Sequence, residues 1–383
     1  MRSLWVVVGL LACDDGGAGV DDSTVAFDGR PGPDTGGLDA TRVGDGAPSD
    51  AEASEAGRMD AGRMDAGRDA GRDAGAPDAG GLDAGPQPPV STWESRAAVV
   101  GGAIQEIAVV ARGGEVWVLG GFDGQTRIVP RVGVYTPATD SWREGPPLPV
   151  PMHHANAAVI DERIYVLGFL GRGFASDGRG YMLAPGSQQW EQVASMPAGR
   201  ERGAAGTVAL GRHIYIVGGL SLGRVYGMVD RYDVDADTWA VVPELPTLRD
   251  HMAAGAVDGR IVVAGGRVGD IESQVDRVDV FDPAESAWRA GAPMPTARGG
   301  TAGAVLDGWL YVIGGEGNRA VASGVFPTVE AYHPASDRWV TLPDMPNPRH
   351  GFGAVAVDGR IYVPGGADVQ AFGAVDTVEV LVP

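Results

Sequence analysis

The chain has no lysine, a single cysteine among its 383 residues, and no segment with the spacing of an amphipathic helix. Without lysine, enzymes that form a Schiff base through a lysine amine are excluded. Because Cys13 is the one cysteine, no disulfide can form within the chain, so its folded part depends on packing alone. The missing helical periodicity favours an all-β protein.

Close to the N-terminus, the apolar run Leu4–Leu11 has eight residues, which is too short for a hydrocarbon core about 30 Å thick. A basic residue before it and a small one after it are typical of an export signal, which we expect over residues 1–12. The letters Leu10-Leu11-Ala12-Cys13 resemble the lipobox of bacterial lipoproteins, which implies lipidation of Cys13. The protein would then be exported and lipid-anchored to a bacterial membrane, facing the periplasm or the cell exterior. An ordinary signal peptide is the alternative.

Residues 13–90 have the composition of a disordered tether. Gly, Ala, Asp and Pro dominate, and the triplet Asp-Ala-Gly recurs between Asp60 and Gly85. Residues 14–90 contain 17 acidic residues and 6 arginines, a net charge of −11. So few bulky apolar side chains cannot offset the entropy lost on ordering. We therefore expect a solvated spacer that holds the folded domain away from a membrane.

Residues 91–383 are repetitive. Tryptophan recurs at intervals of 48 to 51 residues, and a glycine pair recurs in step with it. A period near fifty indicates repeated β units that bury their apolar faces against one another. The tryptophans are Trp93, Trp142, Trp190, Trp239, Trp288 and Trp339, and the pairs begin at Gly120, Gly218, Gly265, Gly314 and Gly365.

One period predicts four short strands. Residues 204–210, 213–217, 227–233 and 239–242 are apolar or alternate in polarity, and turn residues separate them. Such a unit is an antiparallel four-stranded sheet. Sheets repeated around an axis form a propeller, which leaves few exposed sheet edges.

The order of strand, glycine pair, tyrosine and tryptophan resembles the kelch repeat, for example in Leu310–Gly315 followed by Tyr332 and Trp339. The resemblance covers residues 91–383 and implies a six-bladed β-propeller. The last unit lacks a tryptophan strand, so we expect the Trp93 strand to complete the C-terminal blade and close the ring. The second blade should be irregular, because Phe169 replaces a glycine of its pair.

The loops between blades carry the candidate ligand-binding residues. The kelch resemblance implies that arginines at this motif position face the central mouth, where guanidinium groups would suit a carboxylate, an acidic peptide or an acidic sugar. Arginines repeated in this way can instead brace the blades. Ten residues after successive tryptophans stand Met152, Arg200, Arg249, Arg298 and Arg349, and the neighbouring candidates are His153, His251 and His350.

We expect no metal site and no cofactor. The histidines of these loops, His154 included, lack tight ligand spacing. The run Asp233–Glu244 is similar to a calcium loop, but Thr238 stands where glycine is required, so a hairpin turn is expected.

Two functions remain open. The first is a monomeric binding module for a protein, peptide or acidic glycan at the mouth of the propeller. The second is a sugar mutarotase or epimerase, an activity found in kelch-like propellers, with Glu201 or Asp250 as the proton-transferring carboxylate beside an arginine. Copper-radical oxidase chemistry is excluded because the propeller has no cysteine. A net charge of −10 over residues 91–383 argues against a nucleic-acid ligand.

Overall fold

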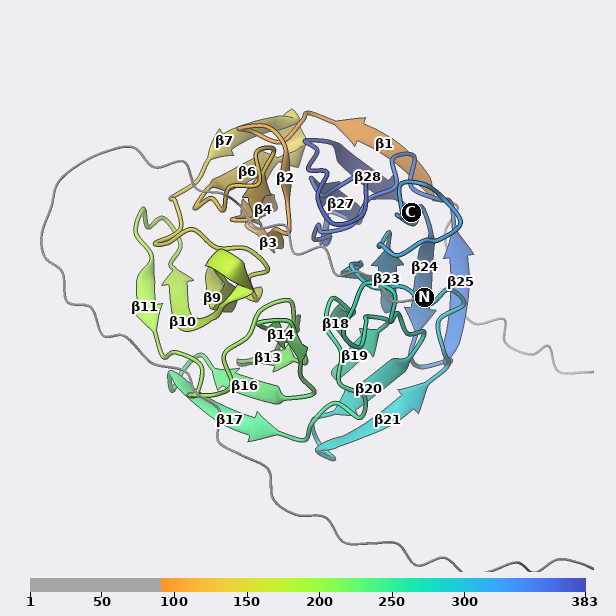
Figure 1. Cartoon of the computed structure of the whole chain (residues 1–383). Coiled ribbons are helices and arrows are strands. Elements are labelled where there is room, and N and C mark those ends of the chain that lie inside the picture. Colours follow the sequence, from red (N-terminus) through yellow and green to blue (C-terminus); the bar gives the residue numbers. More distant parts are fainter. Residues whose placement is uncertain (1–90) are drawn as a thin grey trace, which may run out of the picture. The chain divides into compact units, whose positions relative to one another are not determined.

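The computed structural model describes residues 91–383, which form six four-stranded antiparallel sheets fanned around a central axis (Figure 1). The expected signal, the lipidation site Cys13 and the tether lie outside the described residues. Within the described part, no helix is long and apolar enough to cross a membrane. The predicted all-β, six-bladed propeller is confirmed.

Each sheet places one strand at the axis and three progressively farther out, as Figure 1 shows. Blades 1 to 3 consist of β3 (Ala108–Arg112), β4 (Glu115–Leu119), β6 (Val132–Thr136) and β7 (Ser141–Glu144); β8 (Ala157–Ile160), β9 (Arg163–Leu170), β10 (Ser176–Leu183) and β11 (Glu191–Val193); and β12 (Gly206–Leu210), β13 (His213–Val217), β16 (Val229–Asp233) and β17 (Thr238–Val242).

Blades 4 to 6 consist of β18 (Ala253–Val257), β19 (Arg260–Ala264), β20 (Val278–Asp282) and β21 (Ala287–Gly291); β22 (Ala302–Leu306), β23 (Trp309–Ile313), β24 (Val329–His333) and β25 (Arg338–Leu342); and β26 (Val355–Val357), β27 (Arg360–Pro364), β28 (Val378–Val382) and β1 (Thr92–Arg96). Short pairs join β2 (Ile104–Gln105) to β5 (Phe122–Asp123) and β14 (Leu220–Ser221) to β15 (Arg224–Val225), and two 3-10 turns cover Pro137–Thr139 and Arg172–Phe174.

The ring closes where the two ends of the propeller meet. Strand β1 pairs antiparallel with β28, with Trp93 opposite Leu381 and Arg96 opposite Val378. In Figure 1 the orange β1 accordingly lies beside the blue β28. The N-terminal strand completes the C-terminal sheet as predicted, and it covers an edge that would otherwise be open.

The glycine pairs allow adjacent blades to approach closely. Gly218 has a φ of 60°, and a Cβ there would lie 2.4 Å from the carbonyl oxygen of Arg249 in the next blade. The N–H of Gly219 donates to that same carbonyl at 3.0 Å. A side chain at Gly218 would therefore clash and also strain the backbone.

Blade 2 departs from this pattern, as predicted. With Phe169 in place of the second glycine, β9 and β10 run for eight residues each, and their pairing is bulged between Asp177 and Gly180. The carbonyl of Arg202 in the next blade accepts a hydrogen bond from Asn156 Nδ2 at 2.8 Å. A side-chain amide thus provides the donor that the glycine N–H provides elsewhere.

Tryptophans on the outer strands hold each blade to its neighbour. The indole N–H of Trp239 donates to Ala194 O at 3.0 Å, and the carboxylate of Asp237 accepts from Ala194 N and from Tyr232. All six repeat tryptophans donate to a backbone carbonyl of the preceding blade. The tryptophans therefore join the blades, and the Asp-rich run is a structural hairpin turn as expected.

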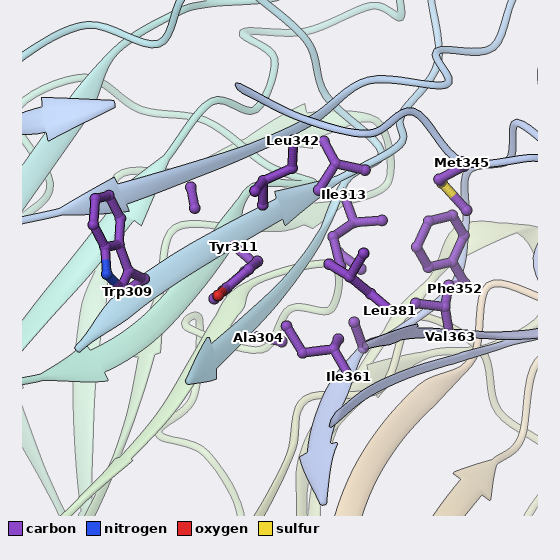
Figure 2. Packing of buried hydrophobic residues seen from close by; sticks show 14 residues of the cluster. Ala304, Trp309, Tyr311, Ile313, Leu342, Met345, Phe352, Ile361, Val363 and Leu381 are labelled. Atoms are coloured by element: carbon purple, nitrogen blue, oxygen red, sulfur yellow. The ribbon is translucent and has the colours of Figure 1, made fainter. Parts of the chain in front are cut away.

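Apolar clusters fill the space between blades. The one in Figure 2 joins blades 5 and 6 through Tyr311, Ile313, Ile361 and Leu381, all at most 2% exposed. Each sheet buries both faces against its neighbours, so the stability of a blade depends on the next one.

Candidate functional site

Four arginines occupy equivalent places inside the blades and not at the mouth. The side chains of Arg202, Arg249, Arg298 and Arg349 are 0% exposed. Arg249 Nη1 pairs with Asp279 Oδ2 at 2.8 Å, and Arg349 Nη1 pairs with Glu379 Oε2 at 2.8 Å. Each also donates to backbone carbonyls of its own blade, as Arg349 does to Val363 O at 3.1 Å. We name these four residues the blade arginines.

The prediction that such arginines face the mouth is therefore wrong, and the bracing role is the one their contacts support. Their carboxylate partners lie on the third strand of the same blade, and burial lowers the pKa of all four guanidinium groups. In blade 3 the equivalent residue is Arg202 and not Arg200, because the loop is longer. Arg200 reaches the same carboxylate from a more exposed position, with its Nε 2.6 Å from Asp230 Oδ1. Met152, also fully buried, takes this place in blade 2.

Two residues after each of these five positions, and at Glu106 in blade 1, the backbone approaches the axis. These six residues form a closed ring. Each N–H donates to the carbonyl of the equivalent residue in the preceding blade, at 2.6 to 3.4 Å. All six residues have a φ between 50° and 69°, which is the left-handed region. We name this set the axial ring: Glu106, His154, Ala204, His251, Gly300 and Gly351.

The axial ring holds larger side chains than its backbone favours. Left-handed φ values suit glycine and cost a residue with a side chain about 1–2 kcal/mol. Gly300 and Gly351 meet this demand, whereas Glu106, His154 and His251 do not. The two glycines also provide room, because a Cβ at Gly351 would lie 2.6 Å from Glu106 Oε1.

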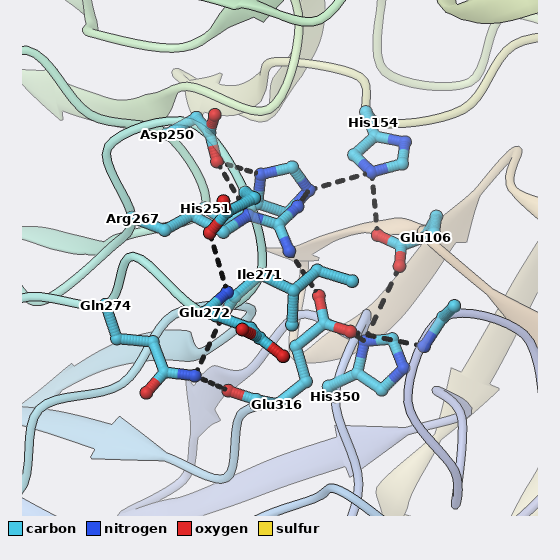
Figure 3. Close-up of polar contacts among 12 residues, drawn as sticks. Glu106, His154, Asp250, His251, Arg267, Ile271, Glu272, Gln274, Glu316 and His350 are labelled. Atoms are coloured by element: carbon cyan, nitrogen blue, oxygen red, sulfur yellow. Dashed lines mark hydrogen bonds and ion pairs between the residues drawn. The ribbon is translucent and has the colours of Figure 1, made fainter. Parts of the chain in front are cut away.

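The three large side chains of the axial ring converge, as Figure 3 shows. His154 Nε2 lies 3.0 Å from Glu106 Oε2 and 3.0 Å from His251 Nε2. The side chains are 10% exposed for Glu106, 5% for His154 and 7% for His251. Among residues 91–383 they form the one group of histidines and acids able to hold a metal ion, with ligand atoms all within 4.8 Å of one another.

A network of buried charges flanks this group. Arg267 donates to Asp250 Oδ1 at 2.9 Å, to Glu316 Oε1 at 2.5 Å and to His251 Nε2 at 2.8 Å. The His350 Nδ1 atom lies 3.6 Å from Glu106 and 3.5 Å from Glu316. The network therefore links blades 1, 4, 5 and 6 across the axis.

The buried environment shifts several pKa values. Burial lowers the pKa of His153 to about 3, with His154 adding to the effect. Burial and the nearby Arg267 also lower the pKa of His251. Burial opposes ionisation of Glu106, but the charge and hydrogen bond of His154, together with the nearby His350 and His251, hold the pKa of Glu106 well below its usual range. Glu106 is thus a carboxylate at neutral pH.

Below the cluster, a channel follows the axis. A cavity of about 120 Å³ is lined by Glu106, His154 and His251, together with small side chains such as Ala155 and Ala205. A second cavity of about 150 Å³ shares Ala155 and Ala205 and continues between the inner strands. Alanine and glycine on these strands leave space for a small ligand or ion to reach the cluster.

On the face of the propeller that carries the axial ring, exposed apolar side chains form a rim. Six of the eight large exposed hydrophobic residues in the described part lie in the loops after the second strand of blades 2 to 6. Phe122, from β5, packs against Phe372 with ring centroids 5.4 Å apart and against His153 at 4.2 Å. The six rim residues are Phe174, Leu222, Val268, Val321, Val369 and Phe372.

The structure brings together some predicted residues and separates others. His251 lies in the axial ring, and His153 and His350 stand one residue before ring positions, beside the cluster. Asp250 is bound to His251 and Arg267. Glu201 packs near Gly178 of β10 and makes none of the cluster's contacts. Since Asp250 is buried in ion pairs, its geometry gives the isomerase hypothesis no support.

Sequence reasoning missed Glu106, Arg267 and Glu316. Arg267 and Glu316 directly follow glycine pairs, where the other blades carry apolar residues or alanine, and Glu106 occupies the ring place in a copy without the arginine. A comparison of the repeats position by position would have marked all three.

Comparison with known proteins agrees with this architecture. A family model described as the Kelch motif matches residues 106–149, 201–246, 248–295 and 297–346. The Kelch-like protein terF of Aspergillus terreus is 36% identical over 298 residues, which cover 73% of this chain and 64% of that protein. Mouse Kelch-like protein 35 is 31% identical over 254 residues, covering 66% of this chain and 41% of its own length.

The matches to these relatives cover only part of each protein. Alpha-scruin of Limulus polyphemus is 31% identical over 170 residues, or 41% of this chain and 18% of that protein. The chain thus spans less than two thirds of the length of these relatives. Matching repeats, the six blades and their glycine pairs agree: the chain belongs to the kelch-repeat family.

Proposed function

We propose that the protein is an exported, membrane-tethered propeller that binds a protein or peptide through the face bearing the rim. The observation that carries this proposal is the concentration of exposed apolar side chains in the loops of five blades on one face. Isolated surface hydrophobics need no explanation, but a grouped set surrounded by polar residues marks an interaction surface.

The chemistry of this face defines the expected partner. The blade arginines are buried, so they are not available on this face to attract an acidic ligand. The propeller carries 33 acidic residues and 23 arginines, a net charge of −10. A partner with apolar anchor side chains and a neutral or basic surface fits best.

Peptides selected on the full chain from a random display library test the binding face. Their affinities are then measured for the Phe174→Ser/Leu222→Ser/Phe372→Ser variant and for a matched pair of single variants. Leu222 on the rim is 72% exposed and Val241 on the outer strand β17 is 67% exposed. Leu222→Ser and Val241→Ser therefore each remove a similarly exposed apolar side chain, and they differ mainly in its location. We expect the triple variant to bind at least about tenfold more weakly. Equal losses for both single variants would contradict the proposal.

The membrane anchor needs a separate test. Cells producing the full chain are compared with cells producing Cys13→Ser, and both are separated into membrane and soluble fractions. A lipid on Cys13 should retain the first protein with membranes and release the second. If both variants partition alike, the anchoring part of the proposal fails while the binding face stays untouched.

A further inference from the structure

The three large residues of the axial ring stand where the backbone is least tolerant of side chains. Gly300 and Gly351 show what the ring geometry prefers, and Ala204 is the smallest alternative. The clash that a Cβ at Gly351 would make with Glu106 indicates that the glycine accommodates this carboxylate. Strained residues that persist at one place generally mark a functional demand.

Hydrogen bonds on the outer side of each imidazole orient both rings. His251 Nδ1 contacts Asp250 Oδ1 at 2.5 Å, so this nitrogen donates and Nε2 keeps its lone pair. His153 Nε2 donates to Gly171 O at 2.9 Å, which leaves His153 Nδ1 to accept from His154 Nδ1, 2.5 Å away. The outer nitrogens are thus both donors, and the two Nε2 atoms face inward.

Three acceptor atoms therefore meet at the axis. The two Nε2 atoms are 3.0 Å apart, and Glu106 Oε2 is 3.0 Å from that of His154. Arg267 donates to the lone pair of His251 Nε2, whereas the lone pairs of His154 Nε2 and Glu106 Oε2 repel each other unless a cation lies between them. A proton on His154 can serve in this way, and so can a metal ion, because a carboxylate that orients a histidine from behind is typical of metal sites.

We propose that Glu106 Oε2, His154 Nε2 and His251 Nε2 bind one divalent transition-metal ion of the zinc type on the propeller axis. Two imidazoles and a carboxylate form a three-ligand set that leaves a fourth position open. The cavity of about 120 Å³ beside these residues gives that position access to water or to a donor atom of a partner.

Two of the three separations between ligand atoms need little change to hold the ion, and the third, between Glu106 and His251, is within 4.8 Å. Bonds of about 2.0–2.1 Å in a tetrahedral zinc site place neighbouring ligand atoms about 3.3 Å apart. The two measured separations of 3.0 Å are slightly shorter, so the side chains must open by a few tenths of an ångström. Arg267 must release His251 Nε2 but keeps Asp250 and Glu316, which neutralise its charge.

Zinc titration of the full chain, followed by competition with a chromophoric chelator, tests this site. The key variants are His154→Gly and His251→Gly, since glycine already occupies two places of the same ring. We expect each to weaken the tightest site by more than about 100-fold. Glu106→Gln removes the carboxylate without changing its shape, and it should also weaken the site.

Two controls separate this site from other effects. Ala204→Gly changes the same ring without removing a ligand, and His213→Gln removes a half-exposed histidine outside the cluster. Both should bind zinc as the unchanged protein does. Any zinc binding by the acidic residues 14–90 would be the same in every variant, so it cannot imitate the expected difference. Far-UV circular dichroism and the Tm of each zinc-free variant establish that it is folded.

Copper(II) provides a second readout. Electron paramagnetic resonance of the copper-loaded chain should show hyperfine coupling to two imidazole nitrogens, and His251→Gly should leave one. Zinc should also raise the Tm of the unchanged protein but not that of Glu106→Gln. If Ala204→Gly and His154→Gly bind zinc equally well, or if no nitrogen coupling is seen, the cation at the axis is a proton and the proposal is overturned.

Discussion

The blade arginines and the axial ring lie two residues apart in the chain, yet they follow opposite rules. Arginine recurs in four blades, and in each blade it pairs with a buried acidic residue at the equivalent position and makes similar carbonyl contacts. The axial ring repeats its backbone bonds and its φ values, whereas its side chains change from glutamate to histidine, alanine and glycine.

The difference follows from symmetry. Every blade needs its own brace, so a bracing residue must recur with the repeat. A ring has a single axis, and a site there is built once from different residues contributed by different blades. In this propeller, repeated polar residues are therefore structural, and chemistry should be sought where the repeats differ.

Breaking one brace should have the largest effect. Arg298→Met leaves the carboxylate of Glu330 buried without its charged partner, and such a loss costs about 3–5 kcal/mol of unfolding free energy. Urea unfolding monitored by tryptophan fluorescence measures it. Adding Glu330→Gln to Arg298→Met should recover a large part, because no unpaired charge then remains buried. A double variant as unstable as the single one would show that the pair does not act as a brace.

Much of the fold could be predicted because the repeat encodes it locally. The intervals between tryptophans defined the blades, and the unpaired strand at Trp93 indicated how the ring closes. Phe169 in a glycine position correctly marked blade 2 as irregular. Each of these features depends on steric demands that act within one blade or between neighbours.

The site could be predicted only in part. Spacing from each tryptophan selected Arg200, but two additional loop residues move the bracing role to Arg202. Spacing also cannot show whether a side chain points to the axis or into its blade. Glu106, Arg267 and Glu316 lie 49 to 210 residues apart, in blades 1, 4 and 5, so no local pattern links them.

A second prediction concerns how the stability of the region around the axial ring depends on pH. His153, beside the axial ring, has a pKa lowered to about 3, against 6.5 for the ordinary group. Between these values the unfolded chain binds the extra proton, so stability is present above pH 6.5 and is lost as the pH falls. From about pH 6.5 to about pH 4.5 the loss should be roughly 2 kcal/mol. His153→Gln should reduce this slope in urea unfolding, whereas His213→Gln should retain it.

A third prediction concerns the ring backbone itself. Gly351→Ala puts a Cβ against the carboxylate of Glu106 at a φ of 63°, and it should cost about 1–2 kcal/mol. Ala204→Gly relieves the same strain and should be neutral or slightly stabilising. Thermal unfolding of both variants measures the difference. Equal Tm values would mean that the left-handed ring imposes no demand on residue type.

The smallest effect is expected at Arg200, and it distinguishes two arginines that share one carboxylate. The Arg200 side chain is 20% exposed and binds Asp230 Oδ1, whereas Arg202 is fully buried on Oδ2. A partly exposed ion pair contributes about 0–1 kcal/mol, and Asp230 keeps Arg202 when Arg200 is removed. Arg200→Ala should therefore lower the unfolding free energy by less than about 1 kcal/mol, while Arg202→Ala should cost several times more. Equal losses of unfolding free energy in parallel urea titrations would contradict this prediction. They would mean that the partly exposed Arg200 stabilises the blade as much as the buried Arg202 does.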